Sequence, residues 1–271
     1  MGLVVNSNIS SLNAQRQLSG STLDLGTSFE RLSSGKRINS ARDDAAGLQI
    51  SARLTSQING LNQASRNSND AISLAQTAEG ALDEFTNAIQ RLRTLAVQAS
   101  NGSNSDQDRI ALDQEFQALN NELDRIARDA SFGGVNLLDG TYSENFQVGA
   151  NAGQTISISI PQNFSSGTIG AAGSVTSFTG AQTAISNLDS ALRLVNSTRA
   201  QLGAAQNRFS SVIRSNDNTA QNVSASRSRI QDTDFAAESA NLARNNVLQQ
   251  ASSSILAQAN QQPQIALSLL Q

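Results

Sequence analysis

One proline-free stretch, residues 40–100, constrains this 271-residue chain more than any other feature. Its apolar residues recur in alternating steps of four and three, with one extra step of three between Ala75 and Ala78. That spacing is typical of a coiled-coil helix with one stammer, a local overwinding. So long a helix cannot bury its apolar stripe on itself, so the rest of the chain must supply partner helices.

The start of this helix is predicted from Ser40 and Asp43, which have the spacing of a capping box. A second stretch of heptad spacing, over 181–230, matches the first in length and is its natural partner. Asn216 and Thr219 occupy apolar positions of that stretch. They either set the pairing register or are tolerated polar layers.

The middle of the chain changes its period from helical spacing to two. Residues 155–160 alternate apolar and polar side chains, and a glycine-containing turn separates them from a similar stretch at 146–148. This pattern predicts a β-hairpin with one buried face. Residues 165–180 are rich in Gly, Ser, Ala and Thr, so we expect an exposed loop there.

The predicted fold is therefore mainly α: a long antiparallel coiled-coil or helical-bundle rod with a small β-hairpin region. Residues 40–231 form this rod. Its elements are helices at 40–100, 105–129 and 181–230, a β-hairpin region at 140–162 and the loop at 165–180.

Composition excludes most catalytic and metal chemistry. The chain has no His and no Cys, which rules out zinc sites of the HExxH type, Ser-His-Asp triads and thiolate ligands. We find no glycine-rich phosphate loop, so we expect no enzyme and no cofactor. The net charge of −3 does not indicate nucleic-acid binding, and no apolar run is long enough for membrane insertion.

The two ends of the chain resemble each other. Residues 1–39 and 232–271 each carry an amphipathic, charge-poor helix joined through a short linker to the predicted rod. We expect the apolar side chains of these two helices to be buried against neighbouring copies and to form the core of a polymer. A contact between different patches on successive copies gives a helical filament when it does not close. The candidate core residues are Val5, Ile9, Leu12, Leu25, Phe29, Leu32, Leu248, Ile255, Leu256, Ile265, Leu267, Leu269 and Leu270.

Several long segments resemble bacterial flagellin, the subunit of the flagellar filament. They are NSNISSLNAQR at 6–16, RLSSGKRINSARDDAAGL at 31–48, LAQANQQP at 256–263 and LSLL at 267–270. The resemblance covers essentially the whole chain, in a short form without the variable outer domain. It implies that the two terminal helices pair as an inner coiled coil. It implies a secreted, extracellular protein that polymerises with itself for swimming motility and leaves the cell by flagellar type III export.

The resemblance also implies particular partners. A flagellin-specific export chaperone is expected at the C-terminal helix, and the filament cap and the hook–filament junction proteins are expected at the two ends of the polymer. The segment QRLRTLAVQ at 90–98 is similar to the flagellin segment read by the flagellin-sensing Toll-like receptor of animals. The matching positions, a candidate receptor and stacking surface, are Arg91, Leu95, Gln98 and Glu115. Thr94 departs from a Glu seen in some strongly recognised members.

Two other functions fit parts of the pattern. A hook–filament junction protein has similar ends but usually matches less faithfully through the first rod helix. A secreted coiled-coil effector that acts as a monomer would not need both terminal helices to be buried.

Overall fold

The computed structural model describes residues 7–268, and the side chains of residues 7–262. The described chain is mainly α with a small antiparallel β region, as predicted. Its helices are α1 (Ile9–Ser34), α2 (Ala45–Ala99), α3 (Asp106–Asp129), α4 (Phe178–Gln231) and α5 (Phe235–Ser268). Its strands are β1 (Ser131–Phe132), β2 (Val135–Asn136), β3 (Tyr142–Gln147) and β4 (Thr155–Ile160).

The chain divides into two compact units. Unit 1 comprises Met1–Ser56 and Asn222–Gln271, and unit 2 comprises Gln57–Gln221. The predicted division at 39/40 and 231/232 falls inside the sequence range of unit 1 and stays a prediction.

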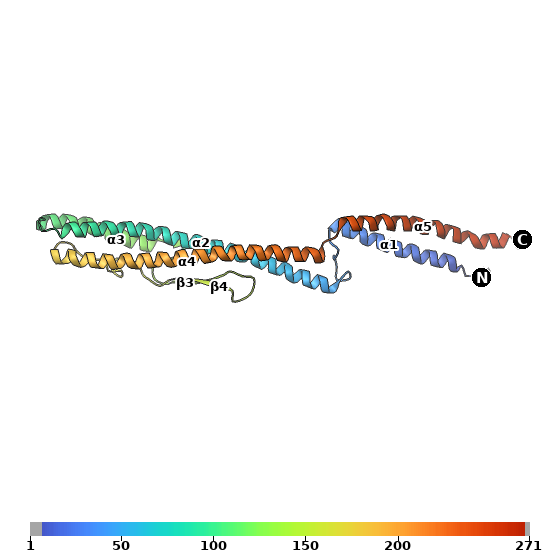
Figure 1. The fold of residues 1–271 in the computed structure, drawn as a ribbon, viewed down its shortest axis with the longest axis horizontal. Coiled ribbons are helices and arrows are strands. Elements are labelled where there is room, and N and C mark those ends of the chain that lie inside the picture. The colour runs from blue at the N-terminus through green and yellow to red at the C-terminus, as the bar shows by residue number, and fades with distance from the viewer. Residues whose placement is uncertain (1–6, 269–271) are drawn as a thin grey trace. The chain divides into compact units, whose positions relative to one another are not determined.

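In unit 1, α1 and α5 run antiparallel and side by side (Figure 1). Their connections to α2 and α4 lie against each other. Gly35 ends α1 with a positive φ of 70°, which glycine adopts without a steric penalty, and its carbonyl accepts a hydrogen bond from Thr233 N at 3.0 Å. Arg37 N donates to Gln231 O at 2.7 Å, and Ile38 is buried.

Helix α2 begins at Ala45, so the predicted start at Ser40 is wrong. Asp43 does accept hydrogen bonds from Ser40 N and Ser40 Oγ, but these close a turn that precedes the helix. The helix is capped by Asp44, whose Oδ1 accepts a hydrogen bond from Gly47 N at 2.8 Å. The capping spacing at Ser40 therefore marks the linker and not the helix.

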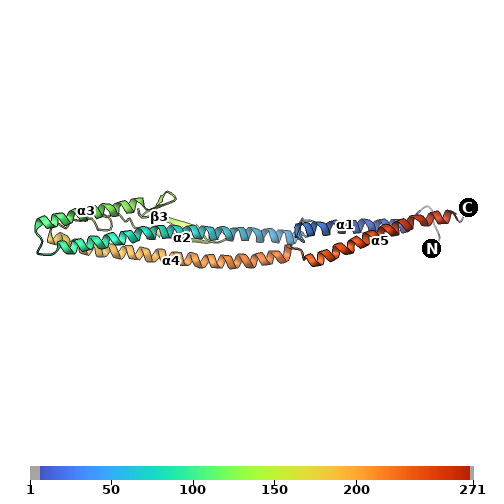
Figure 2. The same ribbon diagram turned by 90° about the horizontal axis from the view of Figure 1, so that it is seen from above.

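In unit 2, α2 and α4 run antiparallel, and Figure 2 shows α3 alongside α2. Polar contacts between α2 and α4 join positions that rise along one helix and fall along the other. They are Ser65 Oγ to Asp217 Oδ1 (3.4 Å), Asp83 Oδ1 to Arg199 Nη2 (3.1 Å) and Arg93 Nε to Asp189 Oδ1 (2.7 Å). The hydrogen bond from Arg93 holds the pKa of Asp189 below its ordinary value.

The buried seam of α2 differs from the predicted one. From Leu61 to Ala99 the buried positions alternate regularly, so the predicted stammer between Ala75 and Ala78 is wrong. The prediction missed the seam positions Ala64 and Ala71 and assigned the half-buried Ser65 and Ile72 in their place. The seam residues are Leu61, Ala64, Ser68, Ala71, Ala75, Ala78, Leu82, Phe85, Ile89, Leu92, Ala96 and Ala99.

The β3–β4 hairpin confirms the predicted alternation. Ile156, Ile158 and Ile160 are buried, and the intervening side chains are exposed. The turn after β3 is attached to unit 2 by Asn216, whose buried Nδ2 donates to Val148 O at 2.9 Å. Asn216 therefore anchors the hairpin turn.

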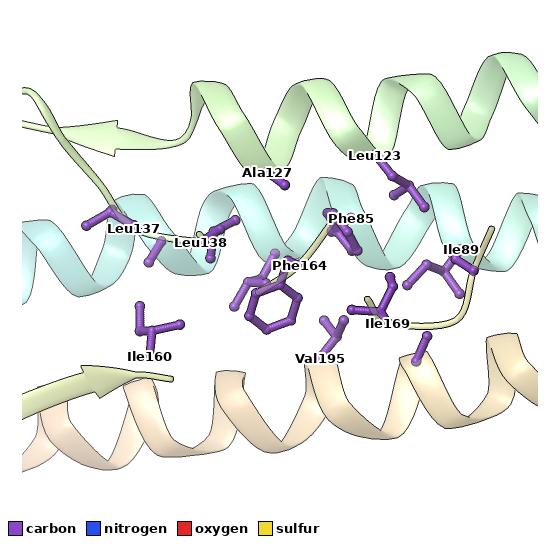
Figure 3. Packing of buried hydrophobic residues seen from close by; sticks show 14 of the residues in the cluster. Phe85, Ile89, Leu123, Ala127, Leu137, Leu138, Ile160, Phe164, Ile169 and Val195 are labelled. Atoms are coloured by element: carbon purple, nitrogen blue, oxygen red, sulfur yellow. The ribbon is translucent and has the colours of Figure 1, made fainter. Parts of the chain in front are cut away.

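The predicted exposed loop at 165–180 is wrong. Residues 163–177, which we call the strap, pack along α3 and contribute four buried side chains to the core: Phe164, Ile169, Ala171 and Val175. Phe164 points between α2 and α4 beside Phe85, with the two rings edge to face at 5.8 Å (Figure 3). Two carboxylates of α3 hold the strap backbone, because Asp113 accepts from Val175 N and Asp124 accepts from Ser166 N, each at 2.7 Å.

Candidate functional site: the terminal helix pair

The contact between α1 and α5 is a seam of small and polar residues. On both helices, buried and half-buried positions recur with heptad spacing. We define this inner seam by Ser11, Ala14, Leu18, Ser21, Leu25, Ser28 and Leu32 of α1, and by Glu238, Leu242, Asn245, Gln249, Ser252, Leu256 and Ala259 of α5. The serines and alanines bury little apolar area and the leucines are only half-buried, so the seam gives this helix pair only modest stability.

Polar contacts fix the register of the pair at both ends. At one end Asn8 Nδ2 donates to Ala259 O at 2.6 Å, and Ser11 Oγ donates to Asn260 Oδ1 at 2.7 Å. At the other end Arg31 Nη1 and Glu238 Oε2 lie 3.7 Å apart, with Glu238 only 7% exposed. Arg31 Nε is buried without a hydrogen-bond partner among the described residues. The ion pair is therefore incompletely satisfied within one chain.

Six large apolar side chains of the two helices lie outside the seam and are exposed. Ile9, Leu12 and Leu23 of α1 are exposed and share one helical face, opposite the inner seam. On α5, Leu248 and Ile255 share a face with Val247 next to it, and all three are exposed. We call these six residues the outer apolar face. Large exposed apolar residues in such number indicate an interaction surface.

The predicted core residues divide between the two faces. Ile9, Leu12, Leu248 and Ile255 belong to the outer apolar face, and Phe29 is also exposed. Leu25, Leu32 and Leu256 are half-buried in the inner seam, where they join α1 to α5.

For the remaining predicted core residues, the structure does not describe the side chains. Val5, Leu269 and Leu270 lie outside the described residues, and Ile265 and Leu267 lie in α5 beyond the described side chains. The sequence prediction omitted Leu23 and Val247 from the core. Ile9 and Leu12 lie three residues apart, and Leu23 falls on the same helical face about four turns after Ile9. This spacing was the signal for a second apolar face on α1.

The second predicted surface lies on unit 2. Arg91 of α2 and Glu115 of α3 are both exposed and form an ion pair, with Nη2 and Oε1 2.6 Å apart. Gln98 is exposed on the same side of α2 as Arg91, two turns further on. Leu95 is only 1% exposed and belongs to the hydrophobic core of unit 2. The prediction that Leu95 belongs to this surface is therefore wrong.

Other chemistry is sparse among residues 7–262. No three acidic, His or Cys side chains of that range gather as metal ligands. Asp124, Asp139 and Asn163 line a pocket of about 280 Å³. Asp124 already binds the strap, and Asp139 accepts from Thr141 N, which holds the pKa of Asp139 below its ordinary value. Within the part of the chain that the structure describes, no helix is long and apolar enough to cross a bilayer.

Comparison with known proteins identifies related chains. Residues 5–143 match the family model for the bacterial flagellin N-terminal helical region, and residues 185–270 match that for the C-terminal helical region. The chain is 48% identical over 272 residues to a flagellin of Halalkalibacterium halodurans, covering 99% of this chain and all of the relative. It is 40% identical to flagellin D of Vibrio anguillarum over an alignment of 376 residues that covers both chains fully.

Solved structures agree with these matches. The crystal structure of Bacillus cereus flagellin is 31% identical with a TM-score of 0.51, over 56% of this chain and 88% of that one. A putative flagellar hook-associated protein from Vibrio parahaemolyticus has a TM-score of 0.60 at 15% identity, over 70% of this chain and all of that one. At that identity the second likeness concerns the fold alone.

Proposed function

The chain belongs to the bacterial flagellins, the structural subunits that polymerise into the extracellular filament for motility, and from this premise we propose that its outer apolar face forms the core contact of the polymer. The observation that carries the proposal is the division of the terminal helices into two faces. The seam within one chain holds small and polar residues with half-buried leucines, and six large apolar side chains outside it stay exposed for contacts with another copy.

Energetics favour contacts between copies. Burying a Leu or Ile side chain fully contributes about 1.5–3 kcal/mol, so covering the six exposed residues of the outer apolar face stabilises a contact between copies. Because the α1 part and the α5 part of the face differ, successive copies meet through unlike patches. Unlike patches whose rotation does not close give an open helical polymer.

The test is seeded polymerisation followed by electron microscopy. Full-length chain and a chain lacking residues 235–271 are each added to short filament fragments. We expect growth from the full chain alone. A full-length chain that remains monomeric on competent seeds would overturn the proposal. A truncated chain that grows as well as the full chain would show that α5 is not part of the core.

We further propose that the export chaperone docks on α5, where it hides the same apolar residues before assembly. Val247, Leu248 and Ile255 are exposed on the paired helices, so a partner reaches them without opening the inner seam. Purified chaperone should bind the full chain and lose affinity for a Val247→Ser, Ile255→Ser variant. Unchanged affinity would exclude this docking site. We propose in the same way that the chain contacts the filament cap and the junction proteins at the ends of the polymer.

Recognition by the animal flagellin-sensing Toll-like receptor is the last part of the proposal. Its surface is reduced to Arg91, Gln98 and Glu115, since Leu95 is buried. A reporter assay with purified monomer should respond to the parent chain and weakly to Arg91→Ala. Silence at saturating dose, or equal responses from both chains, would exclude the role.

A further inference from the structure

The loop between α2 and α3 carries one of the two Asn-Gly pairs of this chain, Asn101–Gly102. The other pair, Asn59–Gly60, lies within α2. Glycine has no Cβ, so nothing shields its backbone nitrogen from the side-chain amide of the preceding asparagine. An exposed Asn-Gly pair is therefore chemically reactive, whereas a pair held in a helix is constrained by its backbone.

The geometry at Asn101 favours reaction. Ser103 N donates a hydrogen bond to Asn101 Oδ1 at 3.3 Å, which closes a turn and holds the side-chain amide over the following peptide. The same hydrogen bond polarises the amide carbonyl and makes its carbon more electrophilic. Asn101 and Gly102 are both exposed, and a Cβ built at Gly102 meets no atom within 4 Å.

We propose that Asn101 is a site of spontaneous deamidation. The Gly102 nitrogen loses its proton to water or hydroxide and attacks Asn101 Cγ. A new C–N bond forms, the bond from Cγ to Nδ2 breaks, and ammonia leaves a cyclic succinimide. Water then adds to either succinimide carbonyl and breaks its bond to the ring nitrogen, which gives aspartate or isoaspartate at position 101.

The helical pair is the internal control. The Gly60 N–H is committed to the hydrogen-bond ladder of α2, and the Gly60 backbone is packed against Ala150, so attack requires local opening. Each 1.4 kcal/mol of opening free energy slows the reaction about tenfold. Asn59 should therefore react at least about tenfold more slowly than Asn101.

Deamidation changes the electrostatics of this end of unit 2. The new carboxylate lies two residues after Ala99, the last residue of α2, where a negative charge opposes the helix dipole. The guanidinium of Arg109 lies beside it and already donates to Ala99 O at 3.1 Å and to Asn101 O at 3.4 Å. Because the assembled subunit is extracellular and out of reach of intracellular turnover, the product accumulates with the age of the filament.

Peptide mapping by mass spectrometry tests the proposal. The full chain is incubated at mildly alkaline pH, sampled over time and digested with trypsin, which places Asn101 on peptide 94–109 and Asn59 on peptide 54–66. We expect peptide 94–109 to yield two products, aspartate and isoaspartate at position 101, while Asn59 persists. In denaturant the two rates should converge, because the folded helix no longer protects Asn59.

Gly102→Ala supplies the matched variant, since the added methyl fits the open space and shields the nitrogen. It should slow the conversion of Asn101 about tenfold or more, which corresponds to about 1.4 kcal/mol of activation free energy. Equal rates at Asn101 and Asn59 in the folded chain, or no effect of Gly102→Ala, would overturn the proposal.

Discussion

Gly60 of α2 lies directly against Ala150 of the hairpin turn. A Cβ built at Gly60 comes within 2.9 Å of Ala150 Cβ and 3.1 Å of Ala150 Cα. Gly60→Ala should therefore push the turn away from α2 at a cost of about 1–3 kcal/mol, more than the helix propensity of about 1 kcal/mol that alanine adds. We expect the free energy of unfolding of Gly60→Ala, measured with denaturant, to be lower than that of Gly80→Ala by about 1–3 kcal/mol.

Gly80→Ala is the matched control on the same helix. A Cβ built at Gly80 meets nothing within 4 Å, so this variant should gain about 1 kcal/mol from helix propensity alone. Equal stabilisation by the two variants would show that the hairpin turn yields without cost.

Phe164 and Phe178 give a second matched pair. Phe164 is 0% exposed and packs on Phe85, whereas Phe178, at the start of α4, is 53% exposed. Phe164→Ala should lower the free energy of unfolding of unit 2 by about 3–5 kcal/mol, because it leaves a cavity between α2 and α4. Phe178→Ala should change it by less than about 1 kcal/mol. A small effect at Phe164 would mean that the strap is not part of the core.

The periodic elements could be predicted from the sequence because one repeated spacing determines each of them. The long helices, the linker at 232–234 and the alternation of Ile156, Ile158 and Ile160 all lie within a few residues of their predicted positions. The strap could not be predicted, because its four buried side chains follow no period. Their burial depends on contacts with α2 and α3, which lie far away in the sequence.

The candidate site was predicted in part for a related reason. The large apolar residues of the terminal helices predicted that these helices form an interaction surface. The serines and alanines of the inner seam contribute little to a hydrophobic pattern, so the pattern does not indicate the seam. Leu25 and Leu32 were therefore grouped with Ile9 and Leu12, although the two pairs lie on opposite faces of α1. Only the pairing of α1 with α5 separates the faces.

Helix α3 should lose stability as the pH falls below about 4. The Ser105 hydroxyl and the Ser105 backbone N–H both donate to the Asp108 carboxylate. These hydrogen bonds, the one from the hydroxyl first, lower the pKa of Asp108 from its ordinary value. A lowered folded-state pKa means that the carboxylate stabilises the fold above the ordinary aspartate pKa of about 3.9. This contribution is lost as the pH falls through the lowered value.

The measurement is an NMR titration of the Asp108 carboxyl carbon in the parent chain and in Ser105→Ala. Removal of the Ser105 hydroxyl removes the largest cause of the shift, so the pKa of Asp108 should rise towards its ordinary value. Ser103→Ala, an exposed change in the same loop, should leave it unmoved. Identical titration curves for the parent and Ser105→Ala would contradict the capping role.

Leu23 should matter for assembly and not for the fold of the single chain. It is 65% exposed, so Leu23→Gln should change the stability of the monomer by less than about 0.5 kcal/mol. In the polymer the same change removes a buried leucine worth about 1.5–3 kcal/mol, which raises the critical concentration about ten- to hundredfold. Sedimentation of polymer from seeded solutions measures that concentration directly.

Leu23→Met keeps the apolar volume and should assemble nearly as the parent chain does. If Leu23→Gln polymerises at the parent's critical concentration, this part of α1 faces solvent in the filament and Leu23 does not belong to the core contact of the polymer.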